Sequence, residues 1–231
     1  MTDIMNAQNI CKRYFREASE TNYFTAVEPV SFTLKKGSLT LLMGRSGSGK
    51  STLLSMLAGL LTPTEGKVFA GSTDIYSLSD KERSVVRNKN IGVIPQGYTA
   101  LFNLTVAENI MLPAGMHRQN MISEAEVRDY TRELMKRLGI YDLRNELPSS
   151  LSGGEMRRMA IARGIINRPD LILADEPTGD LDDENTVFVF KLLRELADGG
   201  AAVMVVSHEE VAAEFADNVF RMTAGNMEAA Q

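Results

Sequence analysis

The sequence lacks the features that mark secreted or membrane-spanning proteins. Cys11 is the single cysteine among 231 residues, so no disulfide can form within the chain, which fits a reducing compartment. No run approaches the roughly 20 consecutive apolar residues of a membrane helix. Residues 1–14 lack the apolar centre of a signal peptide. We therefore expect any membrane association to come from a partner protein.

The sequence also has little concentrated positive charge. Its formal net charge is −5, and no basic run is longer than a pair such as Lys12-Arg13. Binding to a nucleic-acid backbone normally requires a basic face, so no nucleic-acid partner is expected. The chain also has no internal repeat, low-complexity tract or obvious linker. Its length suits one large domain, or one domain with a small lobe, and we treat residues 1–231 as a single domain.

Short apolar runs alternate with helical patterns along much of the chain. The runs at 38–43, 171–176 and 201–207 are continuous, as in strands buried on both faces of a parallel sheet. Between the last two, residues 184–198 place Val187, Phe190, Leu193 and Leu196 on one helical face. The alternation predicts an α/β core with a mostly parallel sheet.

Two regions depart from this alternation. Residues 97–165 contain no strand-like run, and we expect a helical lobe inserted into the core. Within it, Ser123 and Glu126 have capping-box spacing, and Gly139 is expected to end the helix. The first 40 residues, together with 67–75, are expected to form a small antiparallel β region.

The segment GRSGSGKS at 44–51 matches the G-x-x-x-x-G-K-[ST] pattern of a phosphate-binding loop. It follows a strand-like run and precedes a helix-like one, which makes a chance glycine-rich turn a poor explanation. Its backbone N–H groups and the helix N-terminus would face phosphate oxygens. Lys50 would reach the β- and γ-phosphates, and Ser51 would bind Mg²⁺. The residues expected to contact the nucleotide here are Gly44, Arg45, Ser46, Gly47, Ser48, Gly49, Lys50, Ser51 and Thr52.

Polar side chains follow three other apolar runs. Asp175 is suited to hold Mg²⁺, and Glu176 is a candidate general base for the attacking water. An isolated Asp-Glu pair is more often a solvated turn, but the strand and the phosphate loop favour a site. His208 ends another strand, where α/β sheets bind ligands, although a lone histidine is more often structural. Gln96 follows the run at 91–94, at the junction between core and lobe.

The segment LSGGE at 151–155 supplies a second glycine pair before a helix-like run. Taken with GRSGSGKS, Gln96, LILADE, TGDLD and His208, in this order and spacing, it resembles the ABC-type ATPase domain over about residues 5–225. The resemblance implies a P-loop NTPase core with a small antiparallel β region and an inserted helical lobe, and it implies ATP and Mg²⁺. In this family two domains pack head to tail, with each ATP between the phosphate loop of one and the LSGGE of the other. The second glycine pair would therefore serve the partner copy's nucleotide.

The resemblance also implies roles for further residues of this sequence. Tyr14 matches the aromatic residue that stacks on adenine, and Phe15 and Tyr23 remain alternatives. Asp182 matches a loop that communicates across the dimer, and Gln96 links the nucleotide to the lobe. The resemblance implies that the catalytic residues are Lys50, Gln96, Glu176 and His208. It implies that Ser51, Gln96 and Asp175 bind the metal. The implied nucleotide-binding residues are those at 44–52 together with Tyr14, Ser152, Gly153, Gly154, Glu155 and Asp182. The chain departs from the family pattern at Pro95, usually aromatic, and at Met156 and Asp180, often glutamine and asparagine.

DEPTGDLD at 175–182 with NLTVAENIMLP at 103–113 resembles a bacterial subgroup of the family. Its members serve lipoprotein export, macrolide or antimicrobial-peptide efflux and resistance, and cell division, and they pair with membrane proteins of few spans and large extracytoplasmic domains. The resemblance implies a transporter or mechanotransmission subunit on the cytoplasmic face of the inner membrane. The intact catalytic set favours a homodimer.

Three other functions fit the sequence less well. The main alternative is a soluble ABC ATPase acting on ribosomes or nucleic acid, but the chain has neither heptads between its two glycine motifs nor a second ATPase domain. A P-loop kinase of small molecules would leave LSGGE without a role. A structural scaffold would not need competent residues at every catalytic position.

Overall fold

A six-stranded, mostly parallel sheet forms the centre of the protein. The computed structural model describes residues 2–15, 23–97, 99–116, 123–179 and 181–230. The strand order is β10-β9-β3-β8-β7-β6, and only the β10–β9 pair is antiparallel. The strands are β3 (Leu39–Met43), β6 (Ile91–Ile94), β7 (Leu171–Asp175), β8 (Ala202–Val206), β9 (Asn218–Thr223) and β10 (Asn226–Ala229). The predicted α/β core is confirmed.

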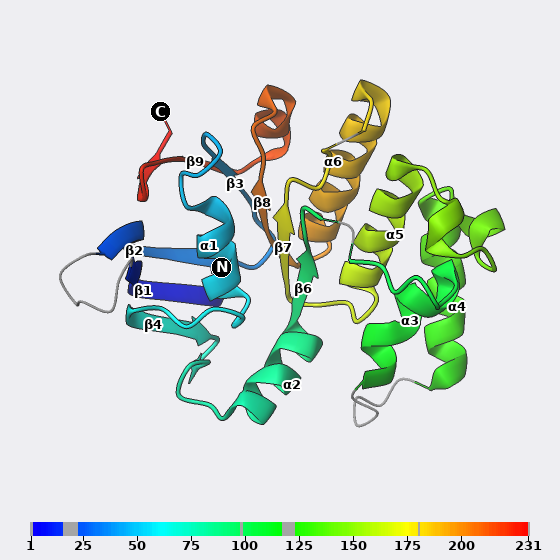
Figure 1. The fold of residues 1–231 in the computed structure, drawn as a ribbon, viewed down its shortest axis with the longest axis horizontal. Helices are drawn as coiled ribbons and strands as arrows, with labels where there is room; N and C mark the ends of the chain where they lie inside the picture. The colour runs from blue at the N-terminus through cyan, green and yellow to red at the C-terminus, as the bar shows by residue number, and fades with distance from the viewer. Residues whose placement is uncertain (1, 16–22, 98, 117–122, 180, 231) are drawn as a thin grey trace.

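Alternate residues of the central strands pack into two separate hydrophobic clusters. On one face, Leu41, Ile172 and Val205 contact α6 (Asp183–Asp198), the helical lobe and the short helix η3 (Glu210–Phe215). On the other face, Leu42 and Leu173 pack with α1 (Lys50–Leu57) and a second sheet. Both faces of the sheet are therefore covered, which explains why its strands are continuous apolar runs. Figure 1 shows the helices on either side of this sheet.

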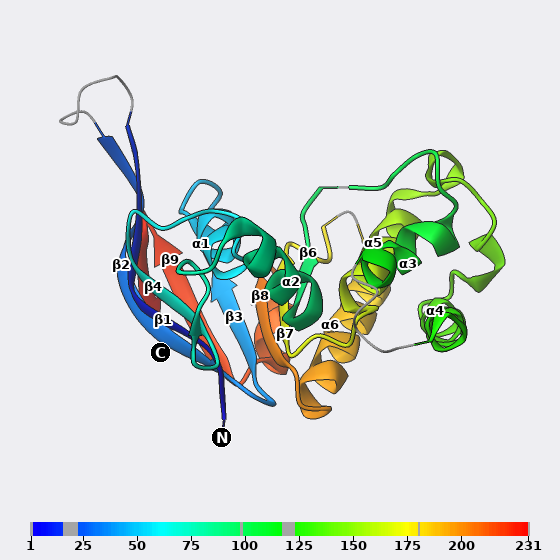
Figure 2. The same cartoon turned by 90° about the horizontal axis from the view of Figure 1, so that it is seen from below.

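The second sheet is antiparallel, as expected for the N-terminal region. Its order is β2-β1-β4-β5, with β1 (Asp3–Phe15), β2 (Tyr23–Lys35), β4 (Glu65–Ala70) and β5 (Thr73–Asp74). β1 and β2 are each 13 residues long, and their paired ends extend well beyond the rest of the sheet (Figure 2).

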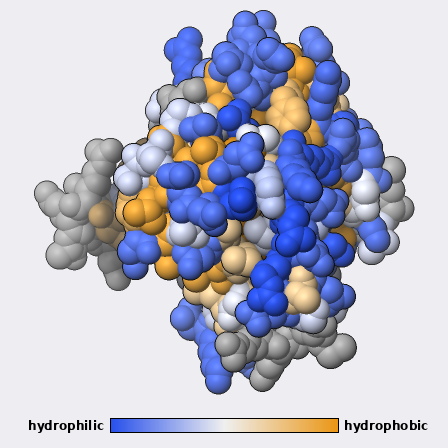
Figure 3. Space-filling model, turned by 90° about the vertical axis from the view of Figure 1, so that its right-hand side faces the viewer, coloured by the Kyte–Doolittle hydropathy of each residue, from blue (hydrophilic) through white to orange (hydrophobic). Residues whose placement is uncertain are grey.

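The described residues between 97 and 165 contain helices and no strand. They form α3 (Val106–Met116), α4 (Glu124–Arg137), the short η1 (Tyr141–Leu143) and η2 (Pro148–Ser150), and α5 (Gly153–Ile165). The capping box of Ser123 and Glu126 is present, and Gly139 follows the helix with a φ of +66°. Hydrophilic side chains cover most of the side that these helices present (Figure 3). Among the described residues, no helix is long and apolar enough to cross a bilayer.

Helix α5 is anchored in the core at its C-terminal end. A Cβ atom placed on Gly92 of β6 would lie 2.3 Å from the carbonyl oxygen of Gly164 in α5, so the two backbones touch. The N-terminal end of α5 begins at the LSGGE segment, and the helix packs against α3 and α4. One helix therefore connects the LSGGE segment to a strand of the central sheet.

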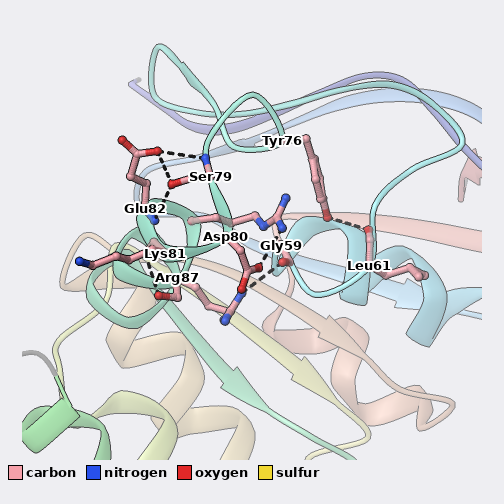
Figure 4. A network of polar contacts seen from close by, with 10 residues as sticks. Gly59, Leu61, Tyr76, Ser79, Asp80, Lys81, Glu82 and Arg87 are labelled. Carbon is pink, nitrogen blue, oxygen red and sulfur yellow. Dashed lines mark hydrogen bonds and ion pairs between the residues drawn. The ribbon is translucent and has the colours of Figure 1, made fainter.

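A polar network fastens the C-terminal end of α1 to α2 (Asp80–Asn90), a helix that its mostly polar sequence did not reveal. The Tyr76 hydroxyl oxygen lies 2.7 Å from the carbonyl oxygens of both Met56 and Leu61. Arg87 donates to the Gly59 carbonyl at 3.2 Å (Figure 4). The helix that begins at the phosphate loop is thus held at its far end by Tyr76 and Arg87.

Candidate nucleotide-binding and hydrolysis site

The sequence motifs follow four neighbouring parallel strands. The glycine loop follows β3, His208 follows β8, Asp175 ends β7 with Glu176 directly after it, and Gln96 follows β6, in the spatial order β3-β8-β7-β6. The carboxyl ends of parallel strands lie at one edge of a sheet, where open α/β sheets bind ligands. This topology brings together segments that are far apart in the chain.

The phosphate loop has a backbone that requires glycine at residue 49. Gly49 precedes α1 with a φ of +108°, which L side chains rarely adopt. A Cβ atom on this residue would lie 2.1 Å from the carbonyl oxygen of Ala26 in β2. The antiparallel sheet therefore presses directly on the loop and helps to fix its shape.

Lys50 lies inside the loop rather than in solvent. It is 7% exposed, and its Nζ donates to the carbonyl oxygens of Gly44 at 2.8 Å and Arg45 at 2.9 Å. The ammonium group is thus held at the mouth of the loop, next to the N-terminus of α1. Ser48 is also 7% exposed, and its Oγ has no hydrogen-bond partner within the described part of the chain.

A cavity of about 500 Å³ joins the loop to the other motifs. The candidate residues that line it are Gly44, Arg45, Ser46, Gly47, Gly49, Lys50, Ser51, Thr52, Gln96, Asp175, Glu176 and His208, and Arg157 and Gly179 complete the lining. Tyr14, Ser48, Ser152, Gly153, Gly154, Glu155 and Asp182 are candidates that do not line it. The structure therefore gathers the proposed catalytic and metal residues and leaves the LSGGE residues elsewhere.

The cavity offers oxygen ligands that suit Mg²⁺. Asp175 Oδ1 is buried and accepts no hydrogen bond from any described residue. A buried carboxylate oxygen without a partner is costly unless a cation or water binds it. The Ser51 hydroxyl and the Gln96 amide belong to residues lining the same cavity. Hard oxygen donors of this kind could hold Mg²⁺, with water filling the remaining positions.

Glu176 is held in an unusual backbone conformation beside His208. Its φ is +49°, a left-handed value that costs free energy in a non-glycine residue and is typical of functional sites. The backbone N–H of Glu176 donates to the Val206 carbonyl at 2.9 Å. Glu176 Oε2 lies 2.8 Å from His208 Nδ1. The imidazole can therefore orient the carboxylate towards a water molecule in the cavity.

Arg157 is a residue of this site that the sequence analysis missed. It is 2% exposed, and its two terminal nitrogens donate to the carbonyl oxygens of Pro95 at 2.9 Å and Gln96 at 2.7 Å. Arginine is a common residue on helix surfaces, so its type and position gave no signal of burial. Only the packing of α5 against the end of β6 reveals the contact.

The LSGGE residues form the capped start of α5. Ser152 accepts from Glu155 N, while Glu155 Oε2 accepts from the Ser152 N–H at 2.7 Å and from the Ser152 hydroxyl at 2.8 Å. The bond from the Ser152 backbone holds the pKa of the Glu155 carboxyl below its ordinary value. Ser152 and Gly153 are exposed. The N–H groups of the first turn that are not used by this cap can face a ligand from outside.

Asp182 and Asp180 follow β7 in the sequence. Asp182 caps α6, because its Oδ1 accepts from the Asn185 N–H at 2.8 Å, and this bond lowers the pKa of the Asp182 carboxyl. Asp180 lies outside the described residues.

Tyr14 lies near the end of the β1–β2 hairpin. Strand alternation places Lys12 and Tyr14 on one face and Phe15 on the other. Lys12 pairs with the buried Val27, lies 5.4 Å above the Tyr14 ring, and bonds to the Thr62 carbonyl after α1. Phe15 instead packs edge-on against Tyr23. Tyr14 therefore shares a face of the hairpin with Lys12, and all three candidate aromatic side chains are exposed, Tyr14 at 41%, Phe15 at 57% and Tyr23 at 50%.

Together, a phosphate loop between a strand and a helix, and carboxylates at the end of a nearby parallel strand, define a P-loop nucleotide-binding protein. Residues 27–179 match the family model described as ABC transporter, and the chain belongs to this family. It is an ATPase of the ABC type.

Similarity to individual proteins extends over the full chain. The chain is 38% identical over 229 residues to the lipoprotein-releasing system ATP-binding protein LolD of Psychrobacter arcticus, covering 99% of each chain. The structure is similar to the ATP-binding cassette MJ0796, which was solved as a dimer in a post-hydrolysis state with ADP and Pi. The TM-score is 0.90 and the sequences are 32% identical, over 98% of this chain and 99% of MJ0796. It is also similar to CbiO1 of Clostridium perfringens, part of the CbiONQ transporter complex. Here the TM-score is 0.81 and the sequences are 26% identical, over 99% of this chain and 88% of CbiO1.

Proposed function

We propose that this chain is the ATP-hydrolysing subunit of a bacterial ABC transporter or mechanotransmission complex. ATP closes a head-to-tail dimer of two copies, and hydrolysis reopens it. One observation carries this proposal: the phosphate cavity at the start of α1 and the LSGGE segment at the start of α5 are separate surfaces of one chain, each at a helix N-terminus that suits an anion. A single nucleotide bound at the phosphate loop leaves the second surface unused, whereas two copies can each complete the other's site. The dimeric form of the similar cassette MJ0796 supports the arrangement.

Each site residue has a specific role in the proposed reaction. The loop N–H groups and Lys50 bind the phosphates, and Glu176 takes the proton of the attacking water while His208 orients its carboxylate. Ser51, Gln96 and Asp175 would hold Mg²⁺, which supplies positive charge to the β- and γ-phosphates. Ser152, Gly153 and Gly154 stabilise the γ-phosphate bound to the partner copy, and Tyr14 stacks on adenine.

We further propose a membrane partner with few spans and a large extracytoplasmic domain, which places this subunit on the cytoplasmic face of the inner membrane. The similarity to LolD supports such a partner, since LolD is named as part of a lipoprotein-releasing system. A groove of about 610 Å³ between α2, α3 and α5 could receive a helix of the partner. Leu60 and Met116 line this groove and are 58% and 66% exposed, which is unusual for large apolar side chains.

The substitution Glu176→Gln tests the catalytic part of the proposal. Removing a general base should lower kcat by about 10²–10⁴-fold while ATP binding persists. Light scattering after size exclusion with ATP and Mg²⁺ should then detect a dimer that ADP does not produce. Glu214→Gln is the matched control, because Glu214 is exposed on η3 and lines no part of the phosphate cavity. Hydrolysis close to the parent rate would remove Glu176 from its role, and a monomer with ATP would contradict the dimer.

Affinity purification of the Glu176→Gln protein from its native membranes with ATP and Mg²⁺ tests the partner. We expect one membrane protein with few spans and a large external domain to be recovered, and Leu60→Glu should reduce its recovery without affecting the ATP-dependent dimer. Recovery with ribosomes or DNA-bound factors, and with nothing from the membrane, would instead favour the soluble class of ABC ATPases.

A further inference from the structure

Two arginines of α5 hold the loop that leads from β6 into the helical lobe. Arg157 donates to the carbonyl oxygens of Pro95 and Gln96 at 2.9 and 2.7 Å. Arg163, six residues further along the helix, donates to the Thr99 carbonyl at 2.8 Å. The loop is therefore bound to the helix that carries LSGGE, on both sides of residue 98.

The contact of Arg157 is the more rigid of the two. Arg157 is only 2% exposed. A buried guanidinium is tolerated only where its N–H groups are hydrogen-bonded. The two terminal nitrogens form a planar fork, so both carbonyls must keep a fixed distance and direction. Pro95 adds stiffness, because its ring fixes φ at this end of the strand. The main chain of Gln96 consequently follows any displacement of Arg157.

Arg157 also lies close to the LSGGE surface on the same helix. It is three residues after Gly154, whereas the opposite end of α5 is fixed by the close contact of Gly164 with Gly92. Any tilt of the helix about this anchored end would move Arg157, because Arg157 lies near the opposite end. Gln96, Arg157 and Asp175 line the same cavity, so this motion reaches the nucleotide site of the same chain.

We propose that Arg157 is a positioning residue that sets the place of Gln96 according to the state of the LSGGE surface. This inference rests on the proposed dimer, in which that surface binds the partner copy's ATP. Binding of the partner's nucleotide then moves Gln96 relative to the Mg²⁺ position in the chain's own site. Two copies of Arg157 couple the two ATP sites of the dimer in this way.

A double-mutant cycle on ATP hydrolysis tests this role. Arg157→Lys keeps the charge but cannot bridge both carbonyls, and we expect kcat to fall about 10-fold, the order expected for one lost charge-assisted hydrogen bond. ADP binding by the monomer should stay within about twofold, because the phosphate loop is untouched, and the Hill coefficient for ATP should fall towards one. Arg132→Lys is the control, since Arg132 forms an exposed ion pair with Asp129 on α4.

The cycle is completed with Gln96→Ala alone and combined with Arg157→Lys. If Arg157 acts through Gln96, the double variant should be no slower than Gln96→Ala, because the second change has nothing left to misplace. Losses in kcat that multiply would show that Arg157 acts independently of Gln96 and would overturn the inference. An unchanged kcat and Hill coefficient in Arg157→Lys would do the same.

If Arg157→Lys does not fold, hydrogen exchange tests the coupling between the LSGGE surface and Gln96 with Arg157 unchanged. In the Glu176→Gln protein, ATP should slow hydrogen exchange in peptides containing Gln96 and in those containing Gly153 with the same ATP dependence. Protection of the Gln96 peptides by ADP alone, without protection at Gly153, would overturn the coupling. Absence of an ATP-dependent dimer in Glu176→Gln would instead refute the proposed function itself.

Discussion

The Tyr76 hydroxyl holds the C-terminal end of α1 through the Met56 and Leu61 carbonyls, a contact that we call the Tyr76 brace. The loss of stability on removing this brace can be estimated from the structure. Tyr76→Phe keeps the ring, and with it the Arg83 guanidinium 5.3 Å from the ring centroid, but removes the hydroxyl shared by the Met56 and Leu61 carbonyls. A lost hydrogen bond that leaves a partly buried acceptor unpaired costs about 1–2 kcal/mol. For a chain of this length that corresponds to a fall in Tm of about 2–8 °C.

The same hydroxyl makes this contribution depend on pH in a known direction. Burial raises the pKa of Tyr76 to about 12, against about 10 for an unfolded tyrosine. The folded state therefore favours the neutral phenol. Its contribution to stability is complete below pH 10 and is lost as pH rises from 10 to 12. The full two-unit difference would be about 2.7 kcal/mol, and because the side chain is only partly buried we expect about 1–2 kcal/mol.

Guanidinium chloride unfolding followed by far-UV circular dichroism at pH 8, 10 and 11.5 measures both effects. The difference in unfolding free energy between the parent and Tyr76→Phe should be about 1–2 kcal/mol at pH 8 and should shrink towards zero at pH 11.5. Subtracting the two curves removes the contribution of the other tyrosines. Equal stability at pH 8, or a difference that stays constant with pH, would refute this account of the brace.

Three further substitutions probe the two nucleotide surfaces. Lys50→Ala should abolish ATP binding in calorimetry, because loop dipoles alone do not replace an ammonium charge on phosphates; binding with near-parent affinity would contradict this. Gly49→Ala should abolish ADP binding and destabilise the fold by more than about 2 kcal/mol, because its Cβ would lie 2.1 Å from the Ala26 carbonyl. Gly71→Ala is its control, with a φ of +58° and open space around the new Cβ, so it should cost only about 1–2 kcal/mol. Ser152→Arg should bind ATP yet neither dimerise nor turn over, and normal turnover would refute the head-to-tail arrangement.

The core of the fold could be predicted because its signals are local. A strand covered on both faces must be continuously apolar, and the runs at 38–43, 171–176 and 201–207 fall on β3, β7 and β8. A capping box needs two residues three apart, so the start of α4 at Ser123 was readable as well.

Features that depend on contacts between distant segments could not be predicted. Helix α2 has no buried residue, so it offers no apolar face to periodicity, and its one local signal, the capping box of Ser79 and Glu82, was missed in the sequence. On α6 the expected face is correct only in part. Phe190 and Leu193 are buried as predicted, but Val187 and Leu196 are only partly buried. Val189 and Leu192 are buried as well, because the helix packs into a broad cluster between the sheet and η3. Arg157 faces the end of β6, which lies more than 60 residues away in the chain.

One chain positions the residues of the phosphate cavity, but its own LSGGE surface lies outside that cavity. Glu176 is held by the Val206 carbonyl and by His208 against the cost of its left-handed backbone, so the proposed general base is already positioned in a single chain. The LSGGE surface is exposed at the start of a separate helix, and the cavity does not include it. If one chain held both surfaces around one nucleotide, ATP would be hydrolysed wherever it bound, and no work would be coupled to it. In the proposed dimer, their separation makes hydrolysis depend on the meeting of two copies, and the proposed membrane partner would govern the reaction by governing that meeting.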